Sequence, residues 1–209
     1  RAGMARIKIT PEKLLWMTGF AARTRPAEGT LQDLWVKALA LEDPAGGRAV
    51  LLTADLCAVP RELTARVAAE LGRRHAILSR SVLVNVSHTH CAPAIPGAIE
   101  GLREFNEQEM ADLHEYRRNL EAKMIEVAGA ALQSMKPAAL AWGRDRAEFG
   151  VNRRENLEKE IPTLRAAGKL RGVVDPDVPV FTVRSERGEL AAVIVSYACH
   201  PTALSGYKW

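Results

Sequence analysis

Residues 81–90 read Ser-Val-Leu-Val-Asn-Val-Ser-His-Thr-His, a β-branched apolar run that leads directly into two histidines. Because β-branched side chains favour the pleated conformation, residues 81–86 are predicted to form a strand. The chain is therefore expected to carry His88 and His90 at the end of this strand.

The residues before this strand predict a hairpin and a helix. Residues 5–9 alternate like a short strand, and apolar positions return at 34–41. The Gly46-Gly47 turn then leads into Ala49-Val50-Leu51-Leu52, a near-continuous apolar run typical of a strand buried on both faces. A helix is expected over residues 60–74, with Pro60 in its first turn and apolar residues at helical spacing: Leu63, Val67 and Leu71.

The residues after His90 predict a further helix, three strands and a loop. One apolar stripe predicts a long helix over residues 107–135, which Lys136-Pro137 ends. The remaining expected elements are three strands and a charged loop: 138–142, 178–183 and 190–197, with the loop at 151–176. Together these elements predict an α/β fold, a mixed β-sheet flanked by helices, in a single domain spanning residues 1–209.

Composition excludes several function classes. The 209 residues are 47% hydrophobic, enough for a buried core, and 29 basic residues nearly balance 25 acidic ones for a net charge of +4. The basic pairs are far apart, so no nucleic-acid partner is expected. No apolar run of 18 residues predicts a transmembrane segment, which leaves a soluble protein, cytoplasmic or secreted. Oligomerisation stays open.

The distribution of histidines is the main chemical signal. His88 and His90 are two residues apart, so in an extended segment both imidazoles point the same way, as a shared cation requires. His200 follows the strand expected at 190–197, so a second histidine ends a second strand. Neutral imidazole suits zinc. The alternative is that these histidines only cap strands; His75 and His114 are assigned no role.

Several other residues lie near these histidines in the sequence. A nucleophilic Ser87 or Cys91 is disfavoured because no nucleophile-elbow pattern is present. A structural zinc site in which Cys57, Cys91 and Cys199 join the histidines is disfavoured because no Cys-x-x-Cys pair gives the usual spacing. Free, buried thiols are favoured, with a Cys91–Cys199 disulfide left open.

Two charged residues complete the candidate site. Asp55 ends the strand expected at 49–52, where its carboxylate either orients a histidine or initiates the following helix. Arg153 lies in the charged loop, where it either binds an anionic group or an oxyanion, or is simply exposed to solvent.

Taken together, the segments resemble the N-terminal catalytic domain of the neutral/alkaline non-lysosomal ceramidase family. The resemblance runs nearly end to end, and it is carried by these motifs: Ile9-Thr10-Pro11, Gly19-Phe20, Leu52-Thr53-Ala54-Asp55-Leu56, Val86-Ser87-His88-Thr89-His90-Cys91-Ala92-Pro93, Phe149-Gly150-Val151-Asn152-Arg153 and Cys199-His200-Pro201-Thr202. The ordered His-Thr-His-x-x-Pro and His-Pro-Thr motifs are its specific part.

The resemblance implies a zinc-dependent hydrolase that cleaves the N-acyl amide bond of ceramide or a related lipid amide. It implies that His88 and His200 are zinc ligands, that His90 assists catalysis, and that Arg153 holds the substrate or the developing oxyanion. In the family a glutamate and a tyrosine further downstream complete the metal site. Residues 1–209 are therefore expected to be the N-terminal portion of a larger catalytic domain.

Two alternatives to this interpretation are kept. An amidohydrolase barrel also carries His-x-His at a strand end and would act on another amide or ester. It is disfavoured because the chain has too few βα units for eight. The second alternative is an inactive fragment of the family that serves as a binding module, because two ligands without the other two bind zinc weakly.

Overall fold

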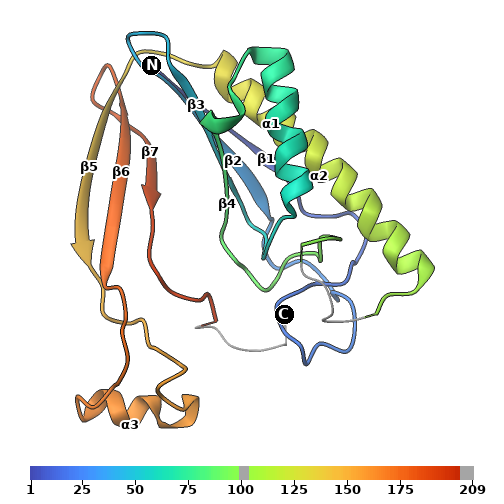
Figure 1. Cartoon of the computed structure of the whole chain (residues 1–209), viewed down its shortest axis with the longest axis vertical. Helices are drawn as coiled ribbons and strands as arrows, with labels where there is room; N and C mark the ends of the chain where they lie inside the picture. Colours follow the sequence, from blue (N-terminus) through green and yellow to red (C-terminus); the bar gives the residue numbers. More distant parts are fainter. Residues whose placement is uncertain (99–103, 203–209) are drawn as a thin grey trace. The chain divides into compact units, whose positions relative to one another are not determined.

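The computed structural model describes residues 1–98 and 104–202 (Figure 1). They form two compact units, unit 1 with residues 1–137 and 201–202, and unit 2 with residues 138–200. Each unit has its own β-sheet, and each is described by itself below.

Unit 1 contains a four-stranded mixed sheet of order β1-β2-β3-β4. The first three strands pair antiparallel, and β4 joins β3 in parallel. Parallel neighbours need a crossover, which helix α1 supplies between β3 and β4. The bounds are Ala2–Lys8 for β1, Trp35–Glu42 for β2, Arg48–Ala54 for β3, Arg61–His75 for α1 and Val82–Val86 for β4.

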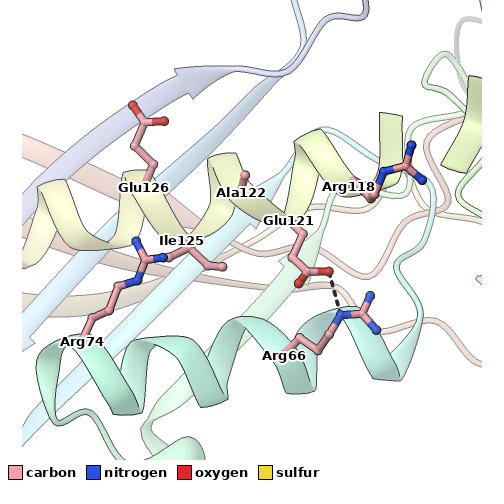
Figure 2. Close-up of a pocket in the computed structure, with 7 residues that line it drawn as sticks. All are labelled: Arg66, Arg74, Arg118, Glu121, Ala122, Ile125 and Glu126. Carbon is pink, nitrogen blue, oxygen red and sulfur yellow. Dashed lines mark hydrogen bonds and ion pairs between the residues drawn. The ribbon is translucent and has the colours of Figure 1, made fainter. Parts of the chain in front are cut away.

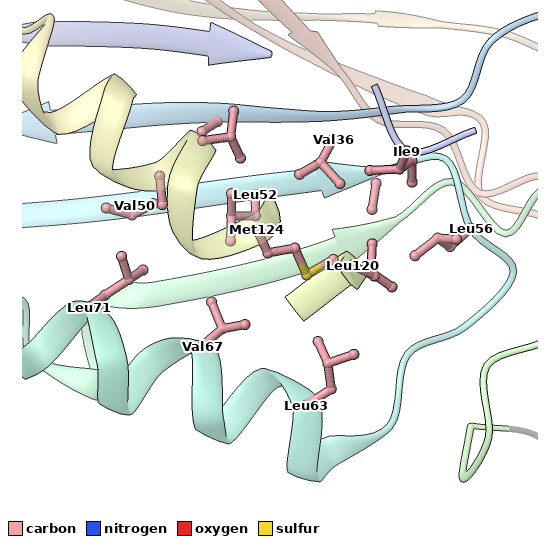
Figure 3. Packing of buried hydrophobic residues seen from close by; sticks show 14 of the residues in the cluster. Ile9, Val36, Val50, Leu52, Leu56, Leu63, Val67, Leu71, Leu120 and Met124 are labelled. Carbon is pink, nitrogen blue, oxygen red and sulfur yellow. The ribbon is translucent and has the colours of Figure 1, made fainter. Parts of the chain in front are cut away.

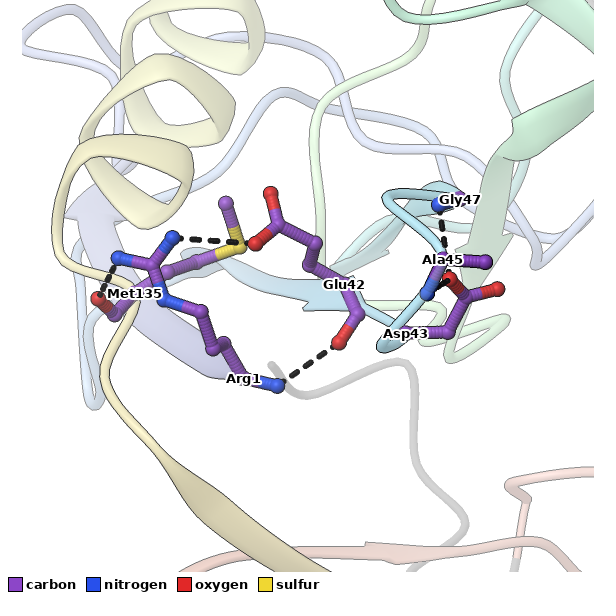
Figure 4. A network of polar contacts seen from close by, with 6 residues as sticks. All are labelled: Arg1, Glu42, Asp43, Ala45, Gly47 and Met135. Atoms are coloured by element: carbon purple, nitrogen blue, oxygen red, sulfur yellow. Dashed lines mark hydrogen bonds and ion pairs between the residues drawn. The ribbon is translucent and has the colours of Figure 1, made fainter.

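The β2–β3 hairpin forms at the predicted Gly46-Gly47 turn. The Asp43 carboxylate accepts hydrogen bonds from the amides of Ala45 and Gly47, both at 2.8 Å, which closes the turn (Figure 4). At the same end of the sheet, the Arg1 guanidinium donates to the Glu42 carboxylate at 3.0 Å and to the Met135 carbonyl at 3.1 Å. These contacts join the first strand, the hairpin and the residues that follow the second helix.

Two helices, α1 and α2, cover one face of this sheet. Helix α2 spans Glu107–Gln133 and begins with a capping box between Asn106 and Glu109. The core lies between helices and sheet, and most of its largest side chains are fully buried (Figure 3): Ile9, Val36, Val50, Leu52, Leu56, Leu63, Val67, Leu71, Leu120 and Met124. The predicted helical stripes are thus confirmed as core.

The prediction that residues 49–52 are buried on both faces was wrong. Val50 and Leu52 are 1% and 0% exposed, whereas Ala49 is exposed and Leu51 is only partly buried. The physical reason is that α1 and α2 pack on the face of Val50 and Leu52, whereas Ala49 and Leu51 alternate to the opposite face of β3. A continuous apolar run does not by itself distinguish these two environments.

Helix α1 differs slightly from its predicted form. Pro60 is the N-cap instead of a residue of the first turn, and the helix continues through Gly72 to His75. Ala76 then adopts a left-handed conformation with φ of 54°, and its amide bonds to the carbonyl of Gly72. A left-handed residue after a helix is usually glycine, so Ala76 stores some backbone strain.

Unit 2 contains a three-stranded antiparallel sheet of order β5-β6-β7. Its strands are β5 Ala138–Arg146, β6 Asp177–Ser185 and β7 Leu190–Val195, which confirms the three predicted strands and the β6–β7 hairpin. Strand β5 is four residues longer than predicted, because its last residues, which include the charged Arg144-Asp145-Arg146, still pair with the first residues of β6.

The segment 151–176 is more ordered than the predicted loop. It contains the short helix α3, Ile161–Ala166, and a buried polar centre at Asn156, which is 2% exposed. The Asn156 amide donates to the carbonyls of Asn152 and Arg171 at 2.7 Å each and accepts from the Arg171 amide at 2.9 Å. Sequence reasoning missed this centre because an asparagine in a charged stretch has no distinguishing periodicity.

The two sheets and their helices confirm the predicted mixed α/β class. In residues 1–98 and 104–202 the strands form two open sheets instead of a closed ring of eight parallel strands. The barrel alternative is therefore wrong. The expected single domain stays a prediction.

Candidate functional site

The His88-Thr89-His90 triplet begins just beyond strand β4, as predicted. The Ser87 amide still bonds to the carbonyl of Ala54 on β3, at 3.0 Å, and pairing then ends. His88 is not extended, because its φ is 56°, in the left-handed region. The prediction that an extended backbone aligns the two imidazoles was therefore wrong in its mechanism.

The two rings nevertheless come together. Their centroids are 5.1 Å apart with an interplanar angle of 77°. A left-handed histidine costs roughly 1–2 kcal/mol of backbone energy, so other contacts must stabilise this turn. Such strained residues are concentrated at functional sites.

The main compensating contact is with Cys57, in the connection from β3 to α1. Nδ1 of His88 lies 2.7 Å from the carbonyl oxygen of Cys57. A carbonyl can only accept, so Nδ1 donates and the neutral ring carries its lone pair on Nε2. A carbonyl contact of this kind orients metal-ligating histidines and fixes their tautomer. His88 is exposed, so its side chain is also accessible.

Cys57 also brings a thiol to the site. Its Sγ lies 3.6 Å from Nδ1 of His88, and one ligand atom from each of Cys57, His88 and His90 lies within 4.8 Å of the others. These three residues fit the donor set of a thiophilic or imidazole-binding ion such as zinc. Cys57 is only 1% exposed, and burial raises the pKa of its thiol.

His90 is buried, with 6% of its surface exposed. The Phe20 ring meets it edge-on, with centroids 4.7 Å apart and an interplanar angle of 79°. Gly19, next to Phe20, also packs against the imidazole. Sequence reasoning used Gly19 and Phe20 only as weak motif residues, because nothing local links them to a histidine so far along the chain.

Asp55 contacts the backbone of the neighbouring strand. Its carboxylate accepts from the amide of Trp35 at 2.9 Å, and its own amide donates to the Trp35 carbonyl at 2.9 Å. The helix-initiating alternative was wrong, because Pro60 is the N-cap of α1. In this structure a backbone carbonyl holds His88, and the predicted role of Asp55 toward a histidine stays a prediction.

Arg153 and His200 both belong to unit 2, and they contact each other. Nη2 of Arg153 lies 2.6 Å from Nδ1 of His200, and both side chains are exposed. A guanidinium can only donate, so Nδ1 accepts and the neutral His200 ring carries its proton on Nε2. In this arrangement, metal ligation by His200 requires the ring to turn or Arg153 to release it.

Tyr197 organises the backbone beside this pair. Its hydroxyl accepts from the amide of Gly150 at 3.0 Å and donates to the carbonyl of Ala147 at 2.9 Å. Tyr197 directly precedes the Ala198-Cys199-His200 sequence. The Phe149–Arg153 motif and His200 are thereby fastened to one another within unit 2.

All three cysteines are free, and their environments differ: Cys57 is buried, Cys91 is half-buried and Cys199 is exposed. The expectation of free thiols is confirmed, whereas their burial is confirmed only for Cys57.

Comparison with protein families identifies the chain. The family model "Neutral/alkaline non-lysosomal ceramidase, N-terminal" matches residues 1–208. The chain belongs to this family. Among curated proteins, none matches the chain.

Two solved structures share the fold of this ceramidase-family chain. A ceramidase complexed with C2 has a TM-score of 0.74 and 21% identity, over 97% of this chain and 31% of the solved one. The neutral ceramidase from Pseudomonas aeruginosa has a TM-score of 0.73 and 20% identity, over 96% and 32% respectively. The chain therefore spans about a third of the length of these two proteins.

A separate groove of this ceramidase-family chain lies between α1 and α2 (Figure 2). It is lined by Arg66, Arg74, Arg118, Glu121, Ala122, Ile125 and Glu126, and an ion pair between Arg66 and Glu121 at 2.8 Å crosses it. It contains none of the predicted site residues. Within residues 1–98 and 104–202, no helix has the length and apolarity that crossing a membrane requires.

Proposed function

We propose that this chain is part of a zinc-dependent hydrolase that cleaves the N-acyl amide bond of ceramide or a related lipid amide. The observation that carries the proposal is the His88–Cys57 contact. It presents the Nε2 lone pair of an exposed histidine beside a second imidazole and a thiol, in a chain of the ceramidase family. Membership of the family supports the reaction class and the lipid amide as substrate.

In this proposal His88 is a metal ligand through Nε2. When bound, zinc would lower the pKa of a water molecule and polarise the amide carbonyl. The Cys57 carbonyl orients the ligand ring by accepting from Nδ1. Because Nδ1 of His88 lies 2.7 Å from the Cys57 carbonyl oxygen and 3.6 Å from its Sγ, we assign the carbonyl and not the thiol as the functional group of Cys57.

His90 is proposed to move protons. Its imidazole lies beside the His88 ring and is shielded from bulk water, which suits a group that takes a proton from the attacking water and delivers it to the leaving amine. Arg153 is proposed to donate its guanidinium hydrogens to the oxyanion that forms as the amide carbonyl is attacked.

His200 is proposed as a further zinc ligand. The support is its place in the His-Pro-Thr motif at the end of β7, together with family membership. The contact of Nδ1 with Arg153 means that ligation is coupled to the position of Arg153. In this proposal, zinc binding by His200 and oxyanion binding by Arg153 therefore depend on each other.

We also propose that residues 1–209 are the N-terminal portion of a larger catalytic domain. The chain covers 31% and 32% of the two solved relatives. Several large apolar side chains on the β5-β6-β7 sheet are exposed, including Trp142 at 77% and Val195 at 59%. Apolar area of this extent on one sheet is typical of a surface that another layer of the same domain covers.

The proposal is tested by zinc content and amide hydrolysis on the same protein preparations. Wild type, His88→Ala and His200→Ala are assayed with short- and long-acyl ceramides in a protein that carries the whole proposed catalytic domain, with His114→Ala as a matched control on the exposed side of α2. We expect one bound zinc and hydrolysis in the wild type and in His114→Ala, and loss of both in His88→Ala. Metal-free protein with the same stability in all variants would contradict the proposal. Zinc binding without turnover would favour the binding-module alternative.

A further inference from the structure

The segment Trp16–Arg23 contacts His90 from several sides. Gly19 lies so close that an added Cβ would be 2.3 Å from Cγ of His90, 2.6 Å from its Cδ2 and 2.7 Å from its Cβ. These distances are far below van der Waals contact. The φ of Gly19 is 105°, a conformation that side chains disfavour as well. Glycine at this position thus lets the backbone touch the imidazole directly.

The next residues hold the rest of His90. The Phe20 ring contacts the imidazole edge-on at 4.7 Å. Arg23 donates from Nη2 to the carbonyl oxygen of His90 at 3.1 Å, and its guanidinium lies 5.8 Å from the centroid of the Phe20 ring. Arg23 is half-buried, and the resulting desolvation lowers the pKa of its guanidinium.

Backbone hydrogen bonds join the same segment to the residues after His90. The Thr18 amide donates to the carbonyl of Ala92 at 3.2 Å, and the Ala94 amide donates to the carbonyl of Trp16 at 2.8 Å. Met17 forms an antiparallel bridge with Pro93 between them. Residues 92–94, which directly follow the turn that carries His90, are thus paired with residues 16–18.

The segment is itself anchored to a rigid element. Nε1 of Trp16 donates to the carboxylate of Glu109 at 2.7 Å. The same carboxylate closes the capping box at the start of α2, where it accepts from the Asn106 amide at 2.9 Å. Displacing Trp16 therefore disturbs a helix cap, which makes the segment a stiff support for His90.

We infer that the 16–23 segment is a positioning element that holds the His90 imidazole in one orientation beside His88, with Gly19 as the residue that sets it. A segment that served only to cover the core would have no need to converge on the ring, the carbonyl and the flanking backbone of a single histidine. The consequence for turnover rests on the proposed function; the consequence for the His90 ring does not.

The first test measures the ring itself in the full chain without zinc. Gly19→Ala is compared with Gly46→Ala, which has a φ of 85° and no atom within 4 Å of an added Cβ. Both variants strain a left-handed glycine, but only Gly19→Ala collides with His90. In NMR spectra of histidine-labelled protein at one pH, with the His90 signal identified by its loss in His90→Gln, we expect Gly19→Ala to shift that signal. The His75 and His114 signals stay in place, and Gly46→Ala shifts none of the three. An unmoved His90 signal in Gly19→Ala, or an equal shift in Gly46→Ala, overturns the inference.

A second pair of variants keeps the test decisive where Gly19→Ala does not fold. Phe20→Tyr keeps the aromatic edge against His90 and is expected to retain the wild-type kcat, whereas Phe20→Leu removes the edge. In amide hydrolysis we expect Phe20→Leu to lower kcat about 10-fold to 100-fold, with KM changed less than about twofold, because a misplaced catalytic group lowers the rate and not substrate binding. Equal kcat in Phe20→Leu and Phe20→Tyr overturns the inference. A wild-type protein that carries the whole proposed catalytic domain but has no amidase activity contradicts the proposed function instead, and the NMR comparison still decides the positioning role.

Discussion

Nδ1 of His88 donates to the carbonyl oxygen of Cys57 across 2.7 Å, and His88 makes this contact from a strained, left-handed backbone conformation. The contact joins the end of β4 to the connection between β3 and α1. It also sets the tautomer of the exposed ring, which is the chemical requirement for a metal-binding Nε2. The strained residue is therefore the one that we propose as a metal ligand.

The backbone strain at His88 predicts an unusual order of stability. In zinc-free protein, His88→Gly is expected to be more stable than His88→Ala by about 0.5–1 kcal/mol, because glycine adopts a left-handed φ without steric cost. The free energy of unfolding from urea titrations measures the difference. Ala76→Gly, at another left-handed non-glycine residue among those the structure describes, is the matched control and should be stabilising relative to wild type. An alanine at position 88 as stable as glycine would show that the turn is unstrained.

The assignment of the Cys57 carbonyl, not its thiol, predicts that Cys57→Ala retains zinc. The variant keeps the carbonyl that orients His88, so its zinc affinity is expected to stay within about threefold of wild type, well short of the roughly 10–100-fold loss typical when an outer contact of a metal site is removed. Competition with a chromophoric chelator measures the affinity. Cys91→Ala serves as a control for cysteine removal. Loss of zinc in Cys57→Ala alone would show that the thiolate is a ligand.

The Arg153–His200 contact predicts opposite effects of one substitution. Arg153→Gln removes the donor that engages Nδ1 of His200, so zinc affinity is expected to rise a few-fold, the size expected for an exposed contact. Loss of an oxyanion donor is expected to lower kcat about 100-fold or more. Zinc titration and ceramide hydrolysis measure the two effects, with Arg154→Gln as the neighbouring exposed control. Weaker zinc binding in Arg153→Gln would contradict the idea that Arg153 competes with zinc for His200.

The buried Asn156 predicts a sensitive point in unit 2. Asn156→Asp replaces the amide donor by a carboxylate oxygen that faces the carbonyls of Asn152 and Arg171. We expect a loss of about 2–4 kcal/mol in local stability, since two buried acceptors lose their donor. Hydrogen exchange and limited proteolysis across residues 152–171 measure it. The exposed Asn119→Asp on α2 should change neither.

Local patterns accounted for most of the secondary structure. The stripe in residues 107–135 predicted α2 to within two residues, and the β-branched run at 81–86 predicted β4, because periodicity depends only on neighbours in the chain. The same patterns could not predict which face of β3 is covered. That depends on where α1 and α2 pack, and the run Ala49–Leu52 is compatible with either environment.

For the candidate site too, local sequence predicted some features and tertiary structure decided the others. By itself the sequence determined that His88 and His90 lie at a strand end and that His200 follows another, because strand-forming residues directly precede each of them. Only the tertiary structure decided that the Cys57 carbonyl holds His88, that Gly19 packs on His90, and that Arg153 engages His200 within unit 2. These contacts join residues far apart in the chain. They arise from strand pairing and helix packing as a whole, which no local pattern encodes.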